Sequence, residues 1–384
     1  MTRKSRRNAN GDGSVFHRSD GRWAAAIYVT EAVTGRRVRR TVYGKTRAEV
    51  ESKLVELRDQ EVKGSPITPI SLTLEAYLNE WLAQVVGPRV RANTLAGYRY
   101  NINRYLVPDL GPKRLGRLTA REVRVYLDSL RRRGVGPRTV QYVHTTLRAA
   151  LEDAVREEIL PKNVAKLVRV PTPPKTEREP LTVDEVRTLL KSARDHRLRA
   201  MFMVFAVLGL RRSEVLGLKW EDVDLVNGVL QVKRGLQRVD GRLTLMPVKT
   251  ARSRRLIPLP GVVVRALEIH LGEQEQERNQ LGSKWPDMGF VFTTPIGTPI
   301  DPRNCTRVVQ DACKAAGLRR VRLHDFRHGC VSVLLGLGVP PRTVMDIVGH
   351  TTMEMTMNIY GHVTFEDKQA AMNQLGDLLE EEEK

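Results

Sequence analysis

The sequence predicts a multidomain α+β protein, because three stretches with different patterning follow one another along the chain. A small three-stranded sheet with one helix is expected first, then a helical bundle, and last a mainly α-helical domain that holds a small β-sheet. The length of 384 residues is sufficient for two or three domains. Hydrophobic residues make up 41% of the chain, so each domain can bury a core.

Two segments of turn-forming and proline-rich composition set the expected domain boundaries. The first lies at about residues 64–69 and separates a domain over residues 1–64 from a helical domain over residues 70–168. The second, residues 169–180, is expected to be an extended linker because its prolines favour extended backbone. A last domain with an acidic C-terminal tail is then expected over residues 181–384.

The first domain shows three short β patterns followed by a helix signal. Asp20-Gly21 is a turn signal between the first two patterns. Thr46 and Glu49 form a capping box, which predicts that a helix begins there. The three expected strands are Ser14 to Phe16, Trp23 to Val29 and Arg36 to Tyr43. A three-stranded sheet with one helix fits this order.

The helical domain carries apolar residues at helical spacing in four successive stretches within residues 70–168. Thr119 and Glu122 form a capping box for the third of these helices. Four amphipathic helices are typical of a bundle. The aromatic residues in the pattern are interpreted as core residues.

The last domain begins with a capping box at Thr182 and Glu185. An apolar helix is expected over residues 197–208, and Gly209 ends it. Three short strands separated by turns are expected next, and the remainder is expected to be largely helical. The strands are Val229 to Lys233, Leu243 to Val248 and Arg255 to Leu259.

The charge of the chain predicts a polyanionic partner. Lys and Arg number 64 against 44 Asp and Glu, a formal net charge of +20. Nucleic acid and an anionic membrane surface both fit that excess, but no run of about 18 apolar residues occurs and no signal peptide precedes the first domain. The three cysteines, Cys305, Cys313 and Cys330, form no CxxC pair, which excludes a zinc ribbon and fits a reducing cytoplasmic setting.

Arginines supply candidate DNA contacts in all three domains. No acidic residue lies among the arginines of the third expected strand. A sheet face with such basic residues can enter the major groove of DNA. A solvated charged face is the alternative. Arginines of the helical domain and of a turn in the last domain are candidates for gripping phosphates. The set comprises Arg36, Arg37, Arg39, Arg40, Arg91, Arg99, Arg138 and Arg252.

Residues with catalytic chemistry gather in the last domain. Four of the eight histidines lie within the 39 residues from 324 to 362. An arginine motif and a lysine in a strand–turn segment lie upstream. The motifs are Gly209-Leu210-Arg211-Arg212-Ser213-Glu214, Val248-Lys249-Thr250, His324-Asp325-Phe326-Arg327-His328, Gly349-His350 and Tyr360-Gly361-His362.

In this order the motifs resemble those of tyrosine recombinases of the phage-integrase type, whose pattern is Arg, Lys, His-x-x-Arg, His or Trp, then Tyr. The matching residues are Arg211, Lys249, His324, Arg327, His350 and Tyr360. Six matches in order over 150 residues are far more specific than any one motif. The resemblance covers the last domain well and the helical domain, as a core-site-binding domain, by its layout. The N-terminal domain resembles an arm-site DNA-binding domain more loosely.

These residue types suit the implied reaction on chemical grounds. A tyrosine oxygen can attack a phosphodiester, release a 5′-hydroxyl and leave a 3′-phosphotyrosyl link that conserves the bond energy. Arg211 and Arg327 would bind the nonbridging phosphate oxygens through planar, permanently charged donors. Lys249 would protonate the leaving oxygen. His324 is expected to accept the tyrosine proton, and His350 to donate to a nonbridging oxygen.

The resemblance implies an integrase that integrates and excises a mobile element or phage genome. Its partners would be double-stranded DNA, at attachment core and arm sites, and three further copies of the chain in a tetramer. A DNA-bending host factor and a directionality factor are also implied, whereas no membrane, metal, ATP or other cofactor is.

Three other functions have partial support in the sequence. His324 and His328 are spaced as in zinc-binding HExxH helices, but Asp325 stands where the general-base Glu would be. A type IB topoisomerase uses the same residue set but relaxes DNA as a monomer. A non-catalytic DNA-binding regulator would be expected to have lost some of the six residues, and all are present.

Overall fold

The computed structural model describes residues 13–30, 36–62, 72–171, 179–239, 241–248, 254–350 and 352–357, together with positions 369 and 373. The chain divides into two compact units, Met1–Thr176 and Glu177–Lys384. The dividing point falls within residues 169–180, where the sequence predicts a linker. Helices in the described part of the chain are all too short or too polar to cross a bilayer.

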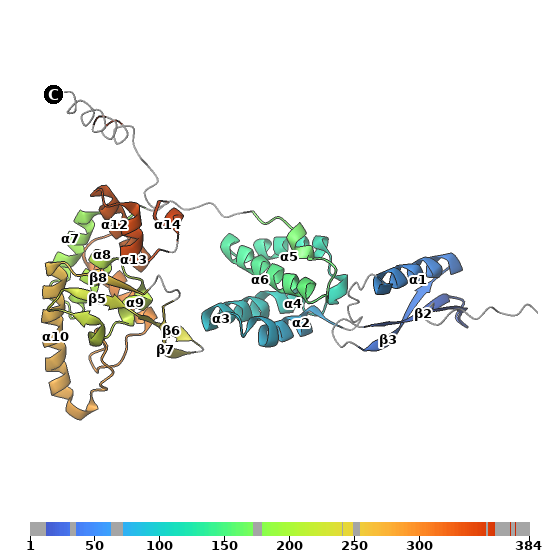
Figure 1. Cartoon of the computed structure of the whole chain (residues 1–384), viewed down its shortest axis with the longest axis horizontal. Coiled ribbons are helices and arrows are strands. Elements are labelled where there is room, and N and C mark those ends of the chain that lie inside the picture. The colour runs from blue at the N-terminus through green and yellow to red at the C-terminus, as the bar shows by residue number, and fades with distance from the viewer. Residues whose placement is uncertain are drawn as a thin grey trace, which may run out of the picture. The chain divides into compact units, whose positions relative to one another are not determined.

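The N-terminal part is an antiparallel sheet in the order β1-β2-β3, followed by one helix, as predicted (Figure 1). Residues Ala25, Ile27 and Val29 of the central strand are buried against Val50 and Leu54 of the helix. Their period of two assigns one face of the sheet to the helix. The elements are β1 Ser14–His17, β2 Trp23–Thr30, β3 Arg37–Gly44 and α1 Arg47–Val62.

The helical part contains the four predicted helical stretches, two of them continued by π-helical turns. The predicted capping box is present, since Thr119 Oγ1 accepts a hydrogen bond from the Glu122 backbone at 3.2 Å, and Glu122 accepts one from the Thr119 backbone at 3.0 Å. The elements are α2 Leu74–Glu80, η1 Trp81–Val86, α3 Ala92–Asn101, η2 Ile102–Leu106, α4 Val107–Leu110, η3 Leu115–Arg117, α5 Ala120–Arg132, α6 Pro137–Arg156 and η4 Val164–Leu167.

The aromatic residues of α2 and η1 are core residues, as the sequence predicts. Tyr77 and Trp81 are fully buried. Their polar atoms are nevertheless bonded to α6, because Tyr77 donates to the Ala150 carbonyl at 2.7 Å and Trp81 donates to Asp153 at 2.8 Å. These bonds offset the desolvation of the two polar tips and fix how α2 packs on α6.

The C-terminal unit surrounds the apolar helix α8 with further helices and two small sheets. Strands β4, β5 and β8 form one sheet, and β6 and β7 form a two-stranded ribbon. Its helices are α7 Val183–Ser192, α8 Arg199–Leu208, α9 Arg212–Leu216, η5 Trp220–Asp222, α10 Gly261–Leu281, η7 Gly282–Lys284, α11 Pro302–Ala315, α12 Leu323–Gly336, α13 Pro341–Val348 and α14 Met353–Met357. Its strands are β4 Val223–Asp224, β5 Val229–Val232, β6 Arg234–Val239, β7 Arg242–Pro247 and β8 Arg255–Pro258.

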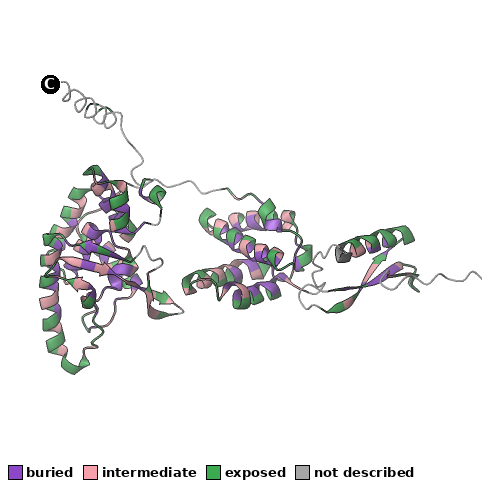
Figure 2. Cartoon of the chain, viewed as in Figure 1, coloured by how far each residue is buried: buried purple, intermediate pink, exposed green. Residues whose placement is uncertain are grey.

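The predicted strands of this unit are present as β5, β7 and β8, but the sequence did not predict β6 or the short β4. Strand β6 pairs with β7 from Arg234↔Pro247 to Val239↔Arg242, so the two form a hairpin. Its polar and glycine residues hide the strand pattern in the sequence. Helix α8 is buried along most of its length, and Figure 2 shows the exposed residues on outer elements such as α10.

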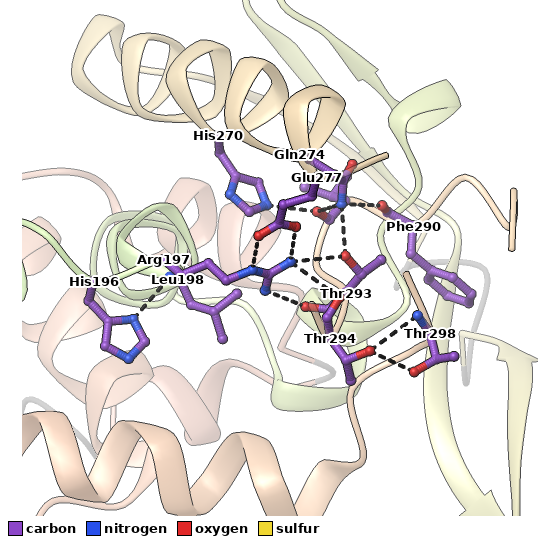
Figure 3. Close-up of polar contacts among 11 residues, drawn as sticks. His196, Arg197, Leu198, His270, Gln274, Glu277, Phe290, Thr293, Thr294 and Thr298 are labelled. Atoms are coloured by element: carbon purple, nitrogen blue, oxygen red, sulfur yellow. Dashed lines mark hydrogen bonds and ion pairs between the residues drawn. The ribbon is translucent and has the colours of Figure 1, made fainter. Parts of the chain in front are cut away.

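A polar network ties α10 and the loop at residues 290–298 to the start of α8 (Figure 3). Arg197 is bonded to the carboxylate of Glu277, with Nη2 at 2.5 Å from Oε2, and donates to the Thr293 carbonyl at 2.6 Å. Gln274, also on α10, donates to the Val291 carbonyl at 3.0 Å and to the Thr293 hydroxyl at 3.0 Å. This loop forms only isolated β-bridges, so side chains of α10 and Arg197 supply the partners of its remaining carbonyls.

We predict that Arg197→Met lowers the free energy of unfolding of the C-terminal unit by about 2 kcal/mol, because it leaves Glu277 and the Thr293 carbonyl without their donor. Urea denaturation followed by the fluorescence of Trp220 and Trp285 measures this. The control is Arg187→Met, whose ion pair with Asp184 is exposed, and which should change stability by less than about 0.5 kcal/mol. Equal midpoints for both variants would contradict the prediction.

Candidate active site

Two of the predicted arginines are positioned by helix starts. Gly209 ends α8 in the left-handed conformation, with φ of +57°, and Arg211 is the N-cap residue of α9 two positions later. A side chain at 209 would also lie 3.1 Å from Cys330 of α12. Arg327 lies in the first turns of α12 and is almost fully buried.

Carbonyl groups at two helix ends hold these two arginines. Arg327 Nη1 donates to the Gly209 carbonyl at 2.9 Å, and Arg211 Nη2 donates to the Gly349 carbonyl at 2.7 Å. Gly349 ends α13 in the left-handed conformation, as Gly209 ends α8. Helix C-termini carry unpaired carbonyls and partial negative charge, so they stabilise cations there.

Glu214, on the first turn of α9, is the buried anion of the site. It accepts from Arg211 Nη1 at 2.8 Å and from the Arg211 backbone at 3.0 Å. Its other partner is Arg255 of β8, whose Nη2 lies 3.1 Å from Oε2. Burial opposes ionisation, but Arg255 and Arg211 outweigh it and hold the pKa of Glu214 below its ordinary value.

His350 packs directly against Arg327. Arg327 Nε lies 3.3 Å from His350 Nε2, and His350 Nδ1 lies 2.9 Å from the hydroxyl of Thr356 on α14. Burial and the charges of Arg327 and Arg211 lower the pKa of His350 to about 3. The ring is therefore neutral at neutral pH, with Nε2 as an acceptor and Nδ1 as a donor. In this structure His350 orients Arg327. The expected donation from His350 to a nonbridging phosphate oxygen stays a prediction.

His324 lies one turn before Arg327 on α12. Its ring meets that of His328 edge-on, with 4.6 Å between centroids. Desolvation, His328 and the arginines lower the pKa of His324 to about 4, so it too is neutral and able to accept a proton. Within the described residues no group of three or more His, Cys, Asp or Glu side chains could hold a metal ion.

The arrangement is suited to an anionic ligand. Arg211, Arg255 and Arg327 bring three positive charges against the single negative charge of Glu214. Among the residues that the structure describes, none accepts a hydrogen bond from the buried Nη2 of Arg327. Burial and Arg211 lower the pKa of Arg327 to about 9, yet the group is still charged at neutral pH. A phosphate oxygen would supply both the missing acceptor and the missing charge.

The structure brings together four of the six predicted catalytic residues: Arg211, His324, Arg327 and His350. Lys249 and Tyr360 lie outside the described residues, as does the candidate DNA contact Arg252. In sequence, Lys249 falls between β7 and β8, and Tyr360 follows α14. Both assignments therefore stay predictions.

Sequence reasoning missed two residues of the site. The sequence identified Arg255 only as the first residue of an expected strand, and its buried position could have been inferred from its alternation with Ile257 on β8. Thr356 had no signal in the sequence, because its role depends on α14 packing beside α13.

The candidate DNA contacts of β3 divide between the two faces of the sheet. Arg37 and Arg39 are exposed on the face away from α1, and Arg36, just before the strand, is exposed as well. Arg40 is a correction, because it is only 7% exposed and shares the period of Val38 and Val42, which pack against the core under α1. We therefore remove Arg40 from the set.

The candidate contacts of the helical part are exposed. Arg91 is the N-cap residue of α3, and Arg99 lies in its last turn. Arg138, at the start of α6, lies over the ring of Tyr142 with 4.8 Å to its centroid. Whether they contact DNA stays a prediction.

Sequence comparison identifies related proteins over most of the chain. The profile of the phage integrase family matches residues 179–367, and that of the phage integrase N-terminal SAM-like domain matches residues 73–131. Tyrosine recombinase XerD of Mycobacterium leprae is 30% identical over 76% of this chain and 93% of the relative. A XerC-like tyrosine recombinase of Caldanaerobacter subterraneus subsp. tengcongensis is 29% identical over 90% of this chain and 93% of the relative.

Solved structures share the fold. The Tn1549 transposon integrase in complex with a circular intermediate DNA superposes with a TM-score of 0.67 at 20% identity, over 79% of this chain and 100% of the other. A lambda integrase tetramer bound to a Holliday junction gives a TM-score of 0.55 at 18% identity, over 92% of this chain and 96% of the other.

The chain belongs to the phage integrase family of tyrosine recombinases. Its function is site-specific recombination, and it cuts and rejoins DNA. The family and the multidomain α+β fold predicted from the sequence are both confirmed.

We predict that Glu214→Gln lowers the free energy of unfolding by about 2–4 kcal/mol at pH 7, because it leaves two arginines without their carboxylate. The folded pKa of Glu214 is below the ordinary 4.5, so this stabilisation is fully present above about pH 4.5 and is lost as the pH falls through the folded pKa. Urea denaturation of both proteins between pH 7 and pH 3.5 should show the difference shrinking in acid. If the difference in free energy of unfolding between the two proteins does not change with pH, Glu214 is not the ionised partner of the two arginines.

Proposed function

We propose that this recombinase is the integrase of a mobile element or phage genome and that it integrates and excises that element through a 3′-phosphotyrosyl intermediate. The observation that carries the mechanism is the buried, unpartnered Nη2 of Arg327 beside Arg211 in a cluster with excess positive charge. Both guanidinium groups are held by helix-end carbonyls before any ligand arrives. Such preorganised donors stabilise charge that develops on a phosphate in the transition state.

In the proposed reaction Tyr360 attacks the scissile phosphorus. The Tyr360 Oη–P bond forms as the P–O5′ bond breaks, and Lys249 gives its proton to the leaving 5′-oxygen. Neutral His324 accepts the tyrosine proton, while His350 keeps Arg327 oriented through Nε2. Rejoining reverses these steps, so the bond energy is conserved and neither ATP nor a metal ion is required.

The three expected domains have separate tasks in this proposal. Residues 1–64 bind arm sites, residues 70–168 bind the core site, and residues 181–384 carry out catalysis, with residues 169–180 as the linker. The exposed face with Arg37 and Arg39 would approach the arm DNA. Chromosomal DNA as substrate would place the reaction in the bacterial nucleoid or host cytoplasm.

Recombination exchanges strands between two duplexes, which requires four active subunits. The lambda integrase neighbour is a tetramer on a Holliday junction, and we extend that assembly to this chain. A DNA-bending host factor and a directionality factor are proposed as further partners. A monomeric topoisomerase would need no such assembly, and a non-catalytic regulator would need no preorganised phosphate site.

The first test is a suicide-substrate assay in EDTA. A nicked duplex from the DNA flanking the gene is incubated with the wild type and with Tyr360→Phe, and denaturing gels are scanned for a protein–DNA adduct. We expect an adduct with the wild type and none with the variant, because the phenol oxygen is the nucleophile. An undiminished adduct with Tyr360→Phe, or none with the wild type despite binding to the DNA, would refute the proposed mechanism.

A second test concerns the N-terminal sheet. Arg39→Ala should weaken binding to arm-containing duplex DNA and reduce the slope of log affinity against log salt by about 1, because one phosphate contact is lost. Fluorescence anisotropy over a salt series measures both. The control is Arg47→Ala, on α1, whose side chain is exposed and paired with Glu51. Equal slopes for the two variants would argue against DNA contact through the open face of the sheet.

A further inference from the structure

Arg255 lies at the centre of the charged cluster, although it matches none of the six catalytic residues. Its Nε donates to the Ile347 carbonyl at 2.7 Å, and its Nη2 donates to Glu214 at 3.1 Å. The residue is only 9% exposed. A guanidinium enclosed in this way is directed at protein groups, so its role is different from that of an arginine that grips phosphate.

Arg255 shares the charge of Glu214 with Arg211. Oε1 of the carboxylate lies 2.8 Å from Arg211 Nη1. Oε2 accepts hydrogen bonds from the Arg211 backbone N–H and from Arg255 Nη2. Without Arg255, the buried carboxylate would be paired with Arg211 alone. The charge of Arg211 would then be largely cancelled where the phosphate must bind, because interactions at this distance are strong in a buried site.

Arg255 also supports the end of α13, which holds Arg211. The carbonyls of Ile347 and Gly349 are bonded to Arg255 and Arg211 respectively. Gly349 approaches the guanidinium so closely that an added Cβ would lie 2.8 Å from Nη1 of Arg255, and its φ of +72° already favours glycine. His350 follows directly, so one guanidinium group contacts both Glu214 and the peptide that leads to His350.

We propose that Arg255 is a positioning residue for strand cleavage: it shares the charge of Glu214 and so leaves the positive charge of Arg211 available to the scissile phosphate. The inference rests on the proposed function and adds a residue outside the six that the sequence pattern identifies. Arg255 also begins β8, six positions after Lys249 in the sequence, so it connects this strand to the arginine cluster.

The test compares Arg255→Gln and Arg255→Lys with a matched control, Arg254→Gln. Arg254 is the adjacent arginine and is exposed. Single-turnover cleavage is measured on the nicked duplex described above and on the same duplex with a methylphosphonate at the scissile position. That substitution removes the negative charge of one nonbridging oxygen and so reduces the need for the charge of Arg211. DNA affinity and thermal unfolding are measured in parallel.

We expect Arg255→Gln to slow cleavage of the phosphate substrate by about tenfold to a hundredfold, below the 10²–10³ of losing a direct donor, with affinity changed by less than about threefold. On the methylphosphonate the loss should fall below about threefold. Arg255→Lys keeps the positive charge but not the planar guanidinium with its several donors. It should show a smaller loss of cleavage rate with the same dependence on the substrate. Arg254→Gln should behave as the wild type on both substrates.

Equal losses on the two substrates would overturn the proposal and assign Arg255 a purely structural role. A rate for Arg255→Gln equal to that of Arg254→Gln would also overturn it. If Arg255→Gln fails to fold, the substrate dependence of Arg255→Lys distinguishes the proposed positioning role from a purely structural one. The absence of any adduct with the wild type would instead refute the proposed function itself, so the two failures are distinguishable.

Discussion

Repulsion among three guanidinium groups that lie near one buried carboxylate is the constraint on which the C-terminal unit depends. Arg211 and Arg255 share Glu214, and Arg327 lies near them with almost no exposure to solvent. Such a cluster is unfavourable in isolation, because burial penalises each charge and one anion cannot neutralise three cations. A bound phosphate would remove much of this repulsion. The repulsion that opposes folding therefore favours binding of an anionic ligand.

Carbonyl groups at two helix ends stabilise these closely spaced cations. Helices α8 and α13 both end at a left-handed glycine, and each glycine carbonyl accepts a hydrogen bond from one of the arginines. The glycines Gly209 and Gly349 are 140 positions apart in sequence, yet they perform the same task. Partial negative charge at the two C-termini stabilises the cations without neutralising them, which leaves their net charge for DNA.

Burial and the same positive charges together set the protonation state of the histidines. The pKa values of both His324 and His350 are lowered, first by burial and then by neighbouring charged groups. A neutral imidazole can accept a proton, which is the state that a general base requires. Arg327 and His350 therefore act on each other: burial and the arginine together keep the ring neutral, and the ring accepts the hydrogen bond that orients the arginine.

Much of the fold could be predicted because its signals are local. The capping boxes at Thr119 and Thr182, the turn at Asp20-Gly21 and the helix stop at Gly209 depend on neighbours in sequence, and the structure has each of them. At Thr46 only half of the predicted box is present, because the Glu49 carboxylate accepts from the Lys45 backbone. Strand β6 was missed because its polar and glycine residues give no β pattern, and only pairing with β7 makes it a strand. Arg40 was misplaced because a run of arginines does not show which face of a sheet each will occupy.

The sequence by itself determined the family, through the order and spacing of six residue types that chemistry requires in one reaction. Tertiary structure alone decided how Glu214 is shared, that Arg255 belongs to the cluster, and that His350 accepts a hydrogen bond from Arg327. The physical reason is that the state of a charged or titratable side chain depends on groups within a few ångströms, and here those groups come from α9, β8, α12 and α13. Folding brings these elements together, and spacing along the chain carries no record of the distances between them.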